Sequence, residues 1–140
     1  MNNLKNIFII DDSSIYHFMM LHKLKLLGFD EEVKAFLDGE EALDFLNQNL
    51  DDTHLLPDLI FLDINMPVMS GFDFLEEFAE IKPKIDKEIT IYVVSSSVDD
   101  VDIERAKNNE HVHSYIIKPF QMEDLKSILK EFQQENQAST

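Results

Sequence analysis

The chain has 140 residues, of which 44% are hydrophobic and 29% charged, as expected for one globular domain. Its 12 Lys and Arg against 28 Asp and Glu give a net charge of −16, which disfavours binding to nucleic acid or anionic membranes, and the absence of cysteine excludes disulfides and thiol nucleophiles. No apolar run reaches the roughly 20 residues that span a bilayer, and the first residues do not have the pattern of a signal peptide, so we expect a cytoplasmic protein.

Apolar runs and helical patterns alternate along the first half of the chain. Residues 7–10 form a continuous, β-branched-rich run, typical of a strand buried on both faces. Asp12, Ser13 or Ser14 can cap the next helix, which ends at Gly28 and has apolar positions near helical spacing at Ile15, Phe18, Met19, Leu26 and Leu27. Residues 32–36 predict a weakly patterned edge strand, and the helix after Asp38 and Gly39 directs Ala42, Leu43 and Leu46 inward.

The second half repeats this alternation. Residues 59–62 predict another buried strand, followed by a loop to Gly71 and a helix that ends before Pro83 and is marked by Phe72, Leu75, Phe78 and Ala79. Residues 89–94 predict a strand, 101–107 a short helix, 115–117 the last strand and 122–132 the last helix. Residues 133–140 predict a frayed polar tail.

Five strands alternating with five helices predict a three-layer α/β fold with a doubly wound parallel sheet. In such a sheet, ligands gather beyond the carboxyl ends of the strands. Polar residues come directly after four of the predicted strands. They are Asp11 and Asp12 after residues 7–10, Asp63 after 59–62, Ser95 and Ser96 after 89–94, and Lys118 after 115–117. We therefore expect three carboxylates, a hydroxyl and an ammonium group at one edge of the sheet.

The three carboxylates are the chemically informative part of this cluster. Each residue alone has an ordinary explanation, such as a helix cap, a turn former or a solvated lysine. Two like charges about 4 Å apart, however, repel by roughly 4 kcal/mol at an effective dielectric constant near 20. One lysine cannot balance three carboxylates, so the cluster predicts raised pKa values or a bound divalent cation, with Mg²⁺ favoured and Mn²⁺ possible.

The combination of Asp11-Asp12, Asp63-Ile64-Asn65-Met66-Pro67, Gly71, Ser95, Tyr115 and Lys118-Pro119-Phe120 resembles the receiver domain of two-component response regulators. The resemblance extends from about Lys5 to Phe132. It implies a flavodoxin-like fold with five parallel strands in the order 2-1-3-4-5 and a single receiver domain over residues 1–140. It also implies a stand-alone phosphoprotein of phosphorelay signal transduction, which signals through protein contacts or relays the phosphate onward. Such a protein is not an enzyme beyond its own phosphotransfer and autodephosphorylation.

The resemblance implies a role for each matching residue. Asp63 is the phosphoacceptor that becomes an aspartyl phosphate, and Lys118, in a cis peptide with Pro119, pairs with its carboxylate or with the phosphoryl oxygens. Asp12, Asp63 and the backbone carbonyl of Asn65 bind the metal, with Asp11 assisting directly or through water, and the Asn65 side chain matters less. Ser95 is the switch hydroxyl and Tyr115 the aromatic switch residue, although the run Ser95-Ser96-Ser97 leaves Ser96 as an alternative hydroxyl.

The expected partners are a sensor histidine kinase or a histidine phosphotransfer protein, and an unknown downstream protein that reads the phosphorylated surface. Two other functions fit the same fold class. A Mg²⁺-dependent phosphohydrolase with an aspartyl nucleophile usually has a second aspartate two residues later, where this chain has Asn65. A flavodoxin-like FMN electron carrier needs a phosphate loop free of carboxylates, where this chain has Asp11 and Asp12.

Overall fold

The computed structural model describes residues 6–29 and 33–138, with side chains up to residue 132. Its elements alternate strictly between strand and helix, apart from one 3₁₀ turn at Lys82–Lys84. In chain order they are β1 (Ile7–Ile10), α1 (Ser14–Leu26), β2 (Val33–Phe36), α2 (Gly39–Gln48), β3 (Leu59–Leu62), α3 (Gly71–Ile81), β4 (Thr90–Ser95), α4 (Asp100–Lys107), β5 (Val112–Ile117) and α5 (Met122–Ala138). Within these ranges no helix is both long and apolar enough to cross a membrane.

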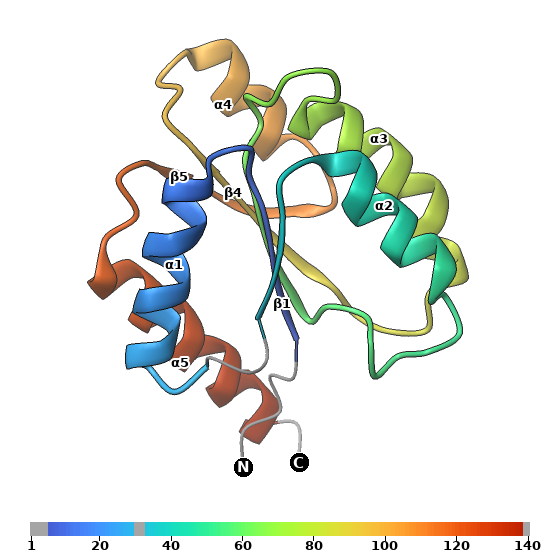
Figure 1. Cartoon of the computed structure of the whole chain (residues 1–140), viewed down its shortest axis with the longest axis horizontal. Helices are drawn as coiled ribbons and strands as arrows, with labels where there is room; N and C mark the ends of the chain where they lie inside the picture. Colours follow the sequence, from blue (N-terminus) through green and yellow to red (C-terminus); the bar gives the residue numbers. More distant parts are fainter. Residues whose placement is uncertain (1–5, 30–32, 139–140) are drawn as a thin grey trace.

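The five strands form one parallel sheet in the order β2-β1-β3-β4-β5, which confirms the predicted fold and strand order. Helices α1 and α5 cover one face of the sheet, and α2, α3 and α4 cover the other (Figure 1). β1, β3 and β4 are almost completely buried, whereas β2 exposes its middle residues, as expected at an edge. The two faces bury separate hydrophobic clusters, because alternate residues of a strand point to opposite sides.

Several element boundaries differ from the prediction. β4 includes Ser95 as its last residue, and β5 begins at Val112 rather than Tyr115. α5 continues to Ala138, so residues 133–138 are helical and the predicted end of the helix at Phe132 is wrong. Its glutamate, glutamine and alanine residues are polar or small, yet they are good helix formers. Residue 32 of the predicted edge strand, Lys5 and residues 139–140 lie outside the described part of the chain.

The buried face of α1 differs from the apolar pattern of the sequence. Ile15, Phe18, Met19 and Leu26 are 72%, 74%, 48% and 65% exposed, whereas the buried residues are His17, Met20 and Leu24. Apolar side chains occur on almost every side of this helix, so spacing alone could not identify the face that meets the sheet. His17 lies on the buried side, and its Nε2 is 2.6 Å from the carbonyl oxygen of Asp11.

The end of the sheet opposite to the predicted site is closed by an ion pair. Lys87 Nζ lies 3.0 Å from Asp58 Oδ1 and donates hydrogen bonds to the carbonyl oxygens of Thr53 and Leu56. The backbone N–H of Asn6 donates to the other carboxylate oxygen of Asp58 at 3.0 Å. These contacts join the start of β1, the start of β3 and the connection before β4, and they give Asp58 a structural role.

Candidate functional site

The carboxylates of the candidate site lie where the strand order reverses. β1 and β3 are neighbours in register, with Ile10 opposite Leu62, so the residues that follow them, Asp11 and Asp63, emerge at the same level. The N–H of Asp63 donates to the Ile10 carbonyl at 2.9 Å, which extends the ladder by one residue. In doubly wound sheets this switch point is where the connections diverge and leave a crevice for a ligand.

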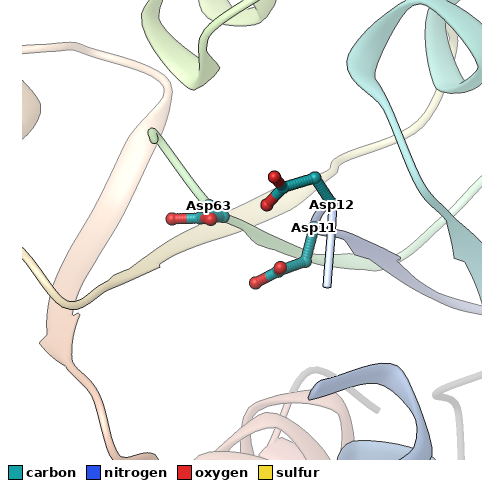
Figure 2. A group of neighbouring side chains, drawn as sticks. All are labelled: Asp11, Asp12 and Asp63. Atoms are coloured by element: carbon teal, nitrogen blue, oxygen red, sulfur yellow. The ribbon is translucent and has the colours of Figure 1, made fainter. Parts of the chain in front are cut away.

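Asp11, Asp12 and Asp63 together form a group that could hold a metal ion. One oxygen of each carboxylate lies within 4.8 Å of the others, and Figure 2 shows the three side chains gathered beyond β1 and β3. Asp11 and Asp63 are only 1% and 5% exposed, whereas Asp12 is exposed. A donor set made only of carboxylate oxygens and open to water on one side fits a hard divalent cation that keeps several water ligands.

Lys118 brings the positive charge of the site. It follows β5, and its N–H donates to the Ser95 carbonyl at 2.8 Å, which aligns it with the end of β4. Its Nζ lies 2.7 Å from Asp11 Oδ2 and 3.8 Å from Asp63 Oδ2. The Lys118–Pro119 peptide bond is cis, as the resemblance implied.

The electrostatic environment of Asp63 is unfavourable for its charge. Burial above all, and next the neighbouring Asp11 carboxylate, raise the pKa of this carboxyl from 3.8 to about 6. Lys118 and the backbone N–H of Asn65, which donates to Asp63 Oδ1 at 3.3 Å, only partly offset these effects. The site therefore becomes more stable when a bound cation or an electrophile neutralises the negative charge of Asp63.

Ser95 and Asn65 are joined by a hydrogen bond that sequence reasoning did not anticipate. The Asn65 side-chain amide donates to Ser95 Oγ at 3.2 Å, so the expectation that this side chain matters less overlooked one of its contacts. Ser95 is completely buried, whereas Ser96 is exposed. Of the two candidates for the switch hydroxyl, Ser95 is the one that is hydrogen-bonded to the loop after Asp63.

Tyr115 is linked to Ser95 through Ser97. The N–H of Ser97 donates to Ser95 Oγ at 3.1 Å, and the carbonyl oxygen of Ser97 accepts a hydrogen bond from the Tyr115 hydroxyl at 2.8 Å. Ser97 is thus a site residue that the sequence analysis missed. The three consecutive serines were the available signal, but they do not show which backbone group meets the tyrosine.

The loop between Asp63 and Gly71 closes tightly over the end of β3. A Cβ atom at Gly71 would lie 2.5 Å from the carbonyl oxygen of Asp63 and 2.6 Å from the Cα of Ile64, so only glycine allows this approach. Within the loop, Val68 has a positive φ of 68° and is bridged by a hydrogen bond from Met69 N–H to the Pro67 carbonyl. This is a γ-turn with the strained sign of φ.

Comparison with known proteins identifies relatives of the whole fold. The family model described as the response regulator receiver domain matches residues 7–130. The chain is 30% identical over 128 residues to the probable methanogenesis regulatory protein FilR2 of Methanothrix harundinacea, covering 91% of this chain and 81% of FilR2.

Two solved structures show the same architecture. The two-component response regulator of Cytophaga hutchinsonii superposes with a TM-score of 0.79 at 26% identity, covering 91% of this chain and 96% of that one. The phosphorylated cyanobacterial phytochrome response regulator RcpA gives a TM-score of 0.71 at 30% identity, covering 92% and 91%.

Proposed function

This chain belongs to the response regulator receiver family. We propose that the carboxylate of Asp63 accepts a phosphoryl group from a phosphohistidine of a partner protein. The observation that carries the proposal is the position of Asp63, a buried carboxylate that lies beside those of Asp11 and Asp12 and 3.8 Å from the ammonium group of Lys118. RcpA, a relative of similar fold, is described in its phosphorylated form. Family membership also leaves no reason to retain the phosphohydrolase or the flavin carrier.

In the proposed reaction, a carboxylate oxygen of Asp63 attacks phosphorus. An O–P bond forms while the P–N bond to the donor imidazole breaks, and the histidine nitrogen leaves with the bonding electron pair. The raised pKa of about 6 leaves Asp63 mostly ionised at neutral pH, so the nucleophile is available without a general base. Lys118, 3.8 Å from Asp63 Oδ2, is close enough to move onto the transferred oxygens.

A magnesium ion is the cofactor that the carboxylate cluster fits. Asp12 and Asp63 would hold it with the carbonyl of Asn65, and Asp11, already bound to Lys118, would assist directly or through water. When bound, Mg²⁺ supplies positive charge for the phosphoryl oxygens in transfer. Phosphorylation should therefore stop in excess EDTA and return with added Mg²⁺ or Mn²⁺.

The contacts of Ser95 suggest how phosphorylation changes the protein surface. A phosphoryl group on Asp63 offers strong acceptors, and the Ser95 hydroxyl would turn toward them. Ser97 donates its N–H to Ser95 Oγ and accepts a hydrogen bond from the Tyr115 hydroxyl at its carbonyl oxygen. A movement of Ser95 would therefore displace Ser97 and, with it, the hydrogen bond to Tyr115. In NMR spectra, beryllofluoride with Mg²⁺ should shift the Tyr115 signals in the wild type and not in Ser95→Ala, and unchanged Tyr115 signals in the loaded wild type would exclude this coupling.

The exposed face of α1 is the surface on which we place the phosphodonor. Ile15, Phe18 and Met19 are exposed on the two turns that follow Asp12, so a protein bound there reaches the site. The helix has no acidic residue and carries Lys23 and Lys25 in its last turn, in a chain with 28 acidic residues. The donor surface should therefore be apolar and flanked by carboxylates.

Phosphorylation by a small donor tests the central proposal directly. Acetyl phosphate with Mg²⁺ should add one hydroxylamine-labile phosphoryl group to the wild type and none to Asp63→Asn. Asp58→Asn is the matched control, because Asp58 is also a buried carboxylate adjoining β3 but lies at the opposite end. Equal labelling of wild type and Asp63→Asn would show that the acceptor is a different residue.

Protein donors test the α1 surface separately. In a phosphotransfer survey of the histidine kinases encoded in the same genome, Phe18→Ser should slow transfer from the cognate kinase while acetyl phosphate still labels the variant at the wild-type rate. Slowing with both donors would mean that Phe18 acts on the site and not on docking.

A further inference from the structure

The ring of Tyr16 lies against the ammonium group of Lys118. Tyr16 is in the first turn of α1 and is half-buried, and Lys118 Nζ is 4.3 Å from the centre of its ring. An ammonium group at this distance from an aromatic face is attracted by the ring quadrupole, and the attraction is stronger when both groups are shielded from water. None of the motifs of the sequence analysis includes this tyrosine.

Tyr16 is connected to Asp11 in two ways, through Ser13 and through Lys118. The N–H of Ser13 donates to Asp11 Oδ1 at 2.9 Å, and Ser13 Oγ accepts from the N–H of Tyr16 at 3.1 Å as the cap of α1. Lys118 Nζ, above the Tyr16 ring, returns to Asp11 through its 2.7 Å bond to Oδ2. The two hydrogen bonds of Ser13 therefore fix the backbone of Tyr16, and with it the ring, relative to Asp11.

Tyr16 makes its contact with the site through the ring and not through the hydroxyl. Its hydroxyl is buried and has no hydrogen-bond partner within the described part of the chain. Burial raises the pKa of this phenol above its usual range, and Asp11 and Asp63 raise it further, so the group stays neutral. The ring thus presents an uncharged aromatic face to Lys118, in addition to the contacts of the ammonium group with Asp11 and Asp63.

The two carboxylates alone do not fix the Lys118 ammonium group near Asp63, because its distances to them differ. Its Nζ is hydrogen-bonded to Asp11 at 2.7 Å but stands 3.8 Å from Asp63, the residue that reacts. A lysine side chain has four flexible carbon–carbon bonds and loses entropy when it is held in one place. A flat ring beneath the ammonium group limits the positions that it can occupy.

We propose that Tyr16 is a positioning residue that holds the Lys118 ammonium group between Asp11 and Asp63 through its aromatic face. The inference rests on the proposed function for its effect on phosphorylation, but the contact itself can be tested without it. Tyr16→Phe keeps the face and Tyr16→Leu removes it, so the two variants separate the ring from the hydroxyl.

The first test measures phosphorylation by acetyl phosphate with Mg²⁺, which involves no docking protein. Tyr16→Leu should lower the rate constant by about three- to tenfold, the range of a partly shielded cation–π contact, while Tyr16→Phe stays within about twofold of wild type. In a Lys118→Met background, Tyr16→Leu should have no further effect. Equal slowing by Phe and Leu, or the same slowing with and without the lysine, would overturn the proposal.

Phe45→Leu provides the matched control, because Lys34 Nζ lies 4.7 Å from the Phe45 ring on the far side of the sheet from α1. It removes a ring from a lysine in the same way, and the phosphorylation rate should stay at the wild-type value. If Phe45→Leu slowed the reaction as much as Tyr16→Leu, a general loss of packing would explain both and the proposal would fail.

A second readout separates this inference from the proposed function. In urea unfolding, the effects of Tyr16→Leu and Lys118→Met on the unfolding equilibrium constant should be non-additive by about threefold or more. Coupling in a protein that acetyl phosphate does not label would refute the proposed function and leave the contact intact. Additive effects would refute the contact, whether or not Asp63 is phosphorylated.

Discussion

Replacing Asp63 by asparagine should stabilise the metal-free protein, because the structure holds this carboxylate in a place that disfavours its charge. The folded-state pKa is about 6 and the ordinary value is 3.8, a difference of roughly two units. At about 1.4 kcal/mol per unit, ionised Asp63 lowers the free energy of unfolding by about 3 kcal/mol at neutral pH. Lys118 keeps its 2.7 Å bond to Asp11 in the variant, so little is lost, and we expect a net gain of about 2 kcal/mol.

The pH dependence of this gain has a definite sign. Because its pKa is raised on folding, folded Asp63 binds its proton more tightly than the unfolded chain does. The wild type therefore loses stability as pH rises from 3.8 to about 6, and the loss is complete above that window. The advantage of Asp63→Asn should be small below pH 3.8, grow through the window and stay constant above it.

Urea unfolding between pH 4 and pH 8, in EDTA and then in saturating Mg²⁺, measures these differences. Mg²⁺ should stabilise the wild type more than Asp63→Asn, which lacks one of the three carboxylates, and so reduce the gap. Asp58→Asn is the control of opposite sign, because it removes the partner of Lys87 and should cost about 2 kcal/mol. An Asp63→Asn variant that is less stable than wild type at pH 7 in EDTA, or a gain independent of pH, would refute the reasoning.

Four further substitutions test the packing of the loop after Asp63 and of α1. Gly71→Ala should lower the free energy of unfolding by about 2 kcal/mol or more and slow phosphorylation by acetyl phosphate, because the new Cβ meets the Asp63 carbonyl; an unchanged rate and stability would contradict this close approach. Val68→Gly should raise the free energy of unfolding by up to about 1 kcal/mol, since it relieves a positive φ, and a loss in urea unfolding would show that the turn is not strained. Phe18 is exposed and Met20 is buried, so Phe18→Ser should change the free energy of unfolding by less than about 0.5 kcal/mol, whereas Met20→Ala should lower it by about 3 kcal/mol. A larger loss for Phe18→Ser than for Met20→Ala would mean that the opposite face of α1 packs against the sheet.

The amino-acid sequence determined the fold class and the main groups of the site. A buried strand of four residues reads as a continuous apolar run, and β1 and β3 both do. Since parallel strands end at one edge of the sheet, polar residues directly after such runs must gather there, and Asp11, Asp12 and Asp63 do. The order of the strands came from the resemblance and not from the pattern, because alternation alone is compatible with several orders.

The tertiary structure decided the contacts between side chains distant in the sequence. The Asn65 amide meets Ser95, and Lys118 lies on the ring of Tyr16, although these pairs are 30 and 102 residues apart. Such contacts depend on strand register, on helix rotation and on rotamers, none of which has a local signal in the sequence. The same reason applies to α1: with apolar residues on nearly every side, only packing against the sheet selected Met20 and Leu24 for the core and left Phe18 exposed.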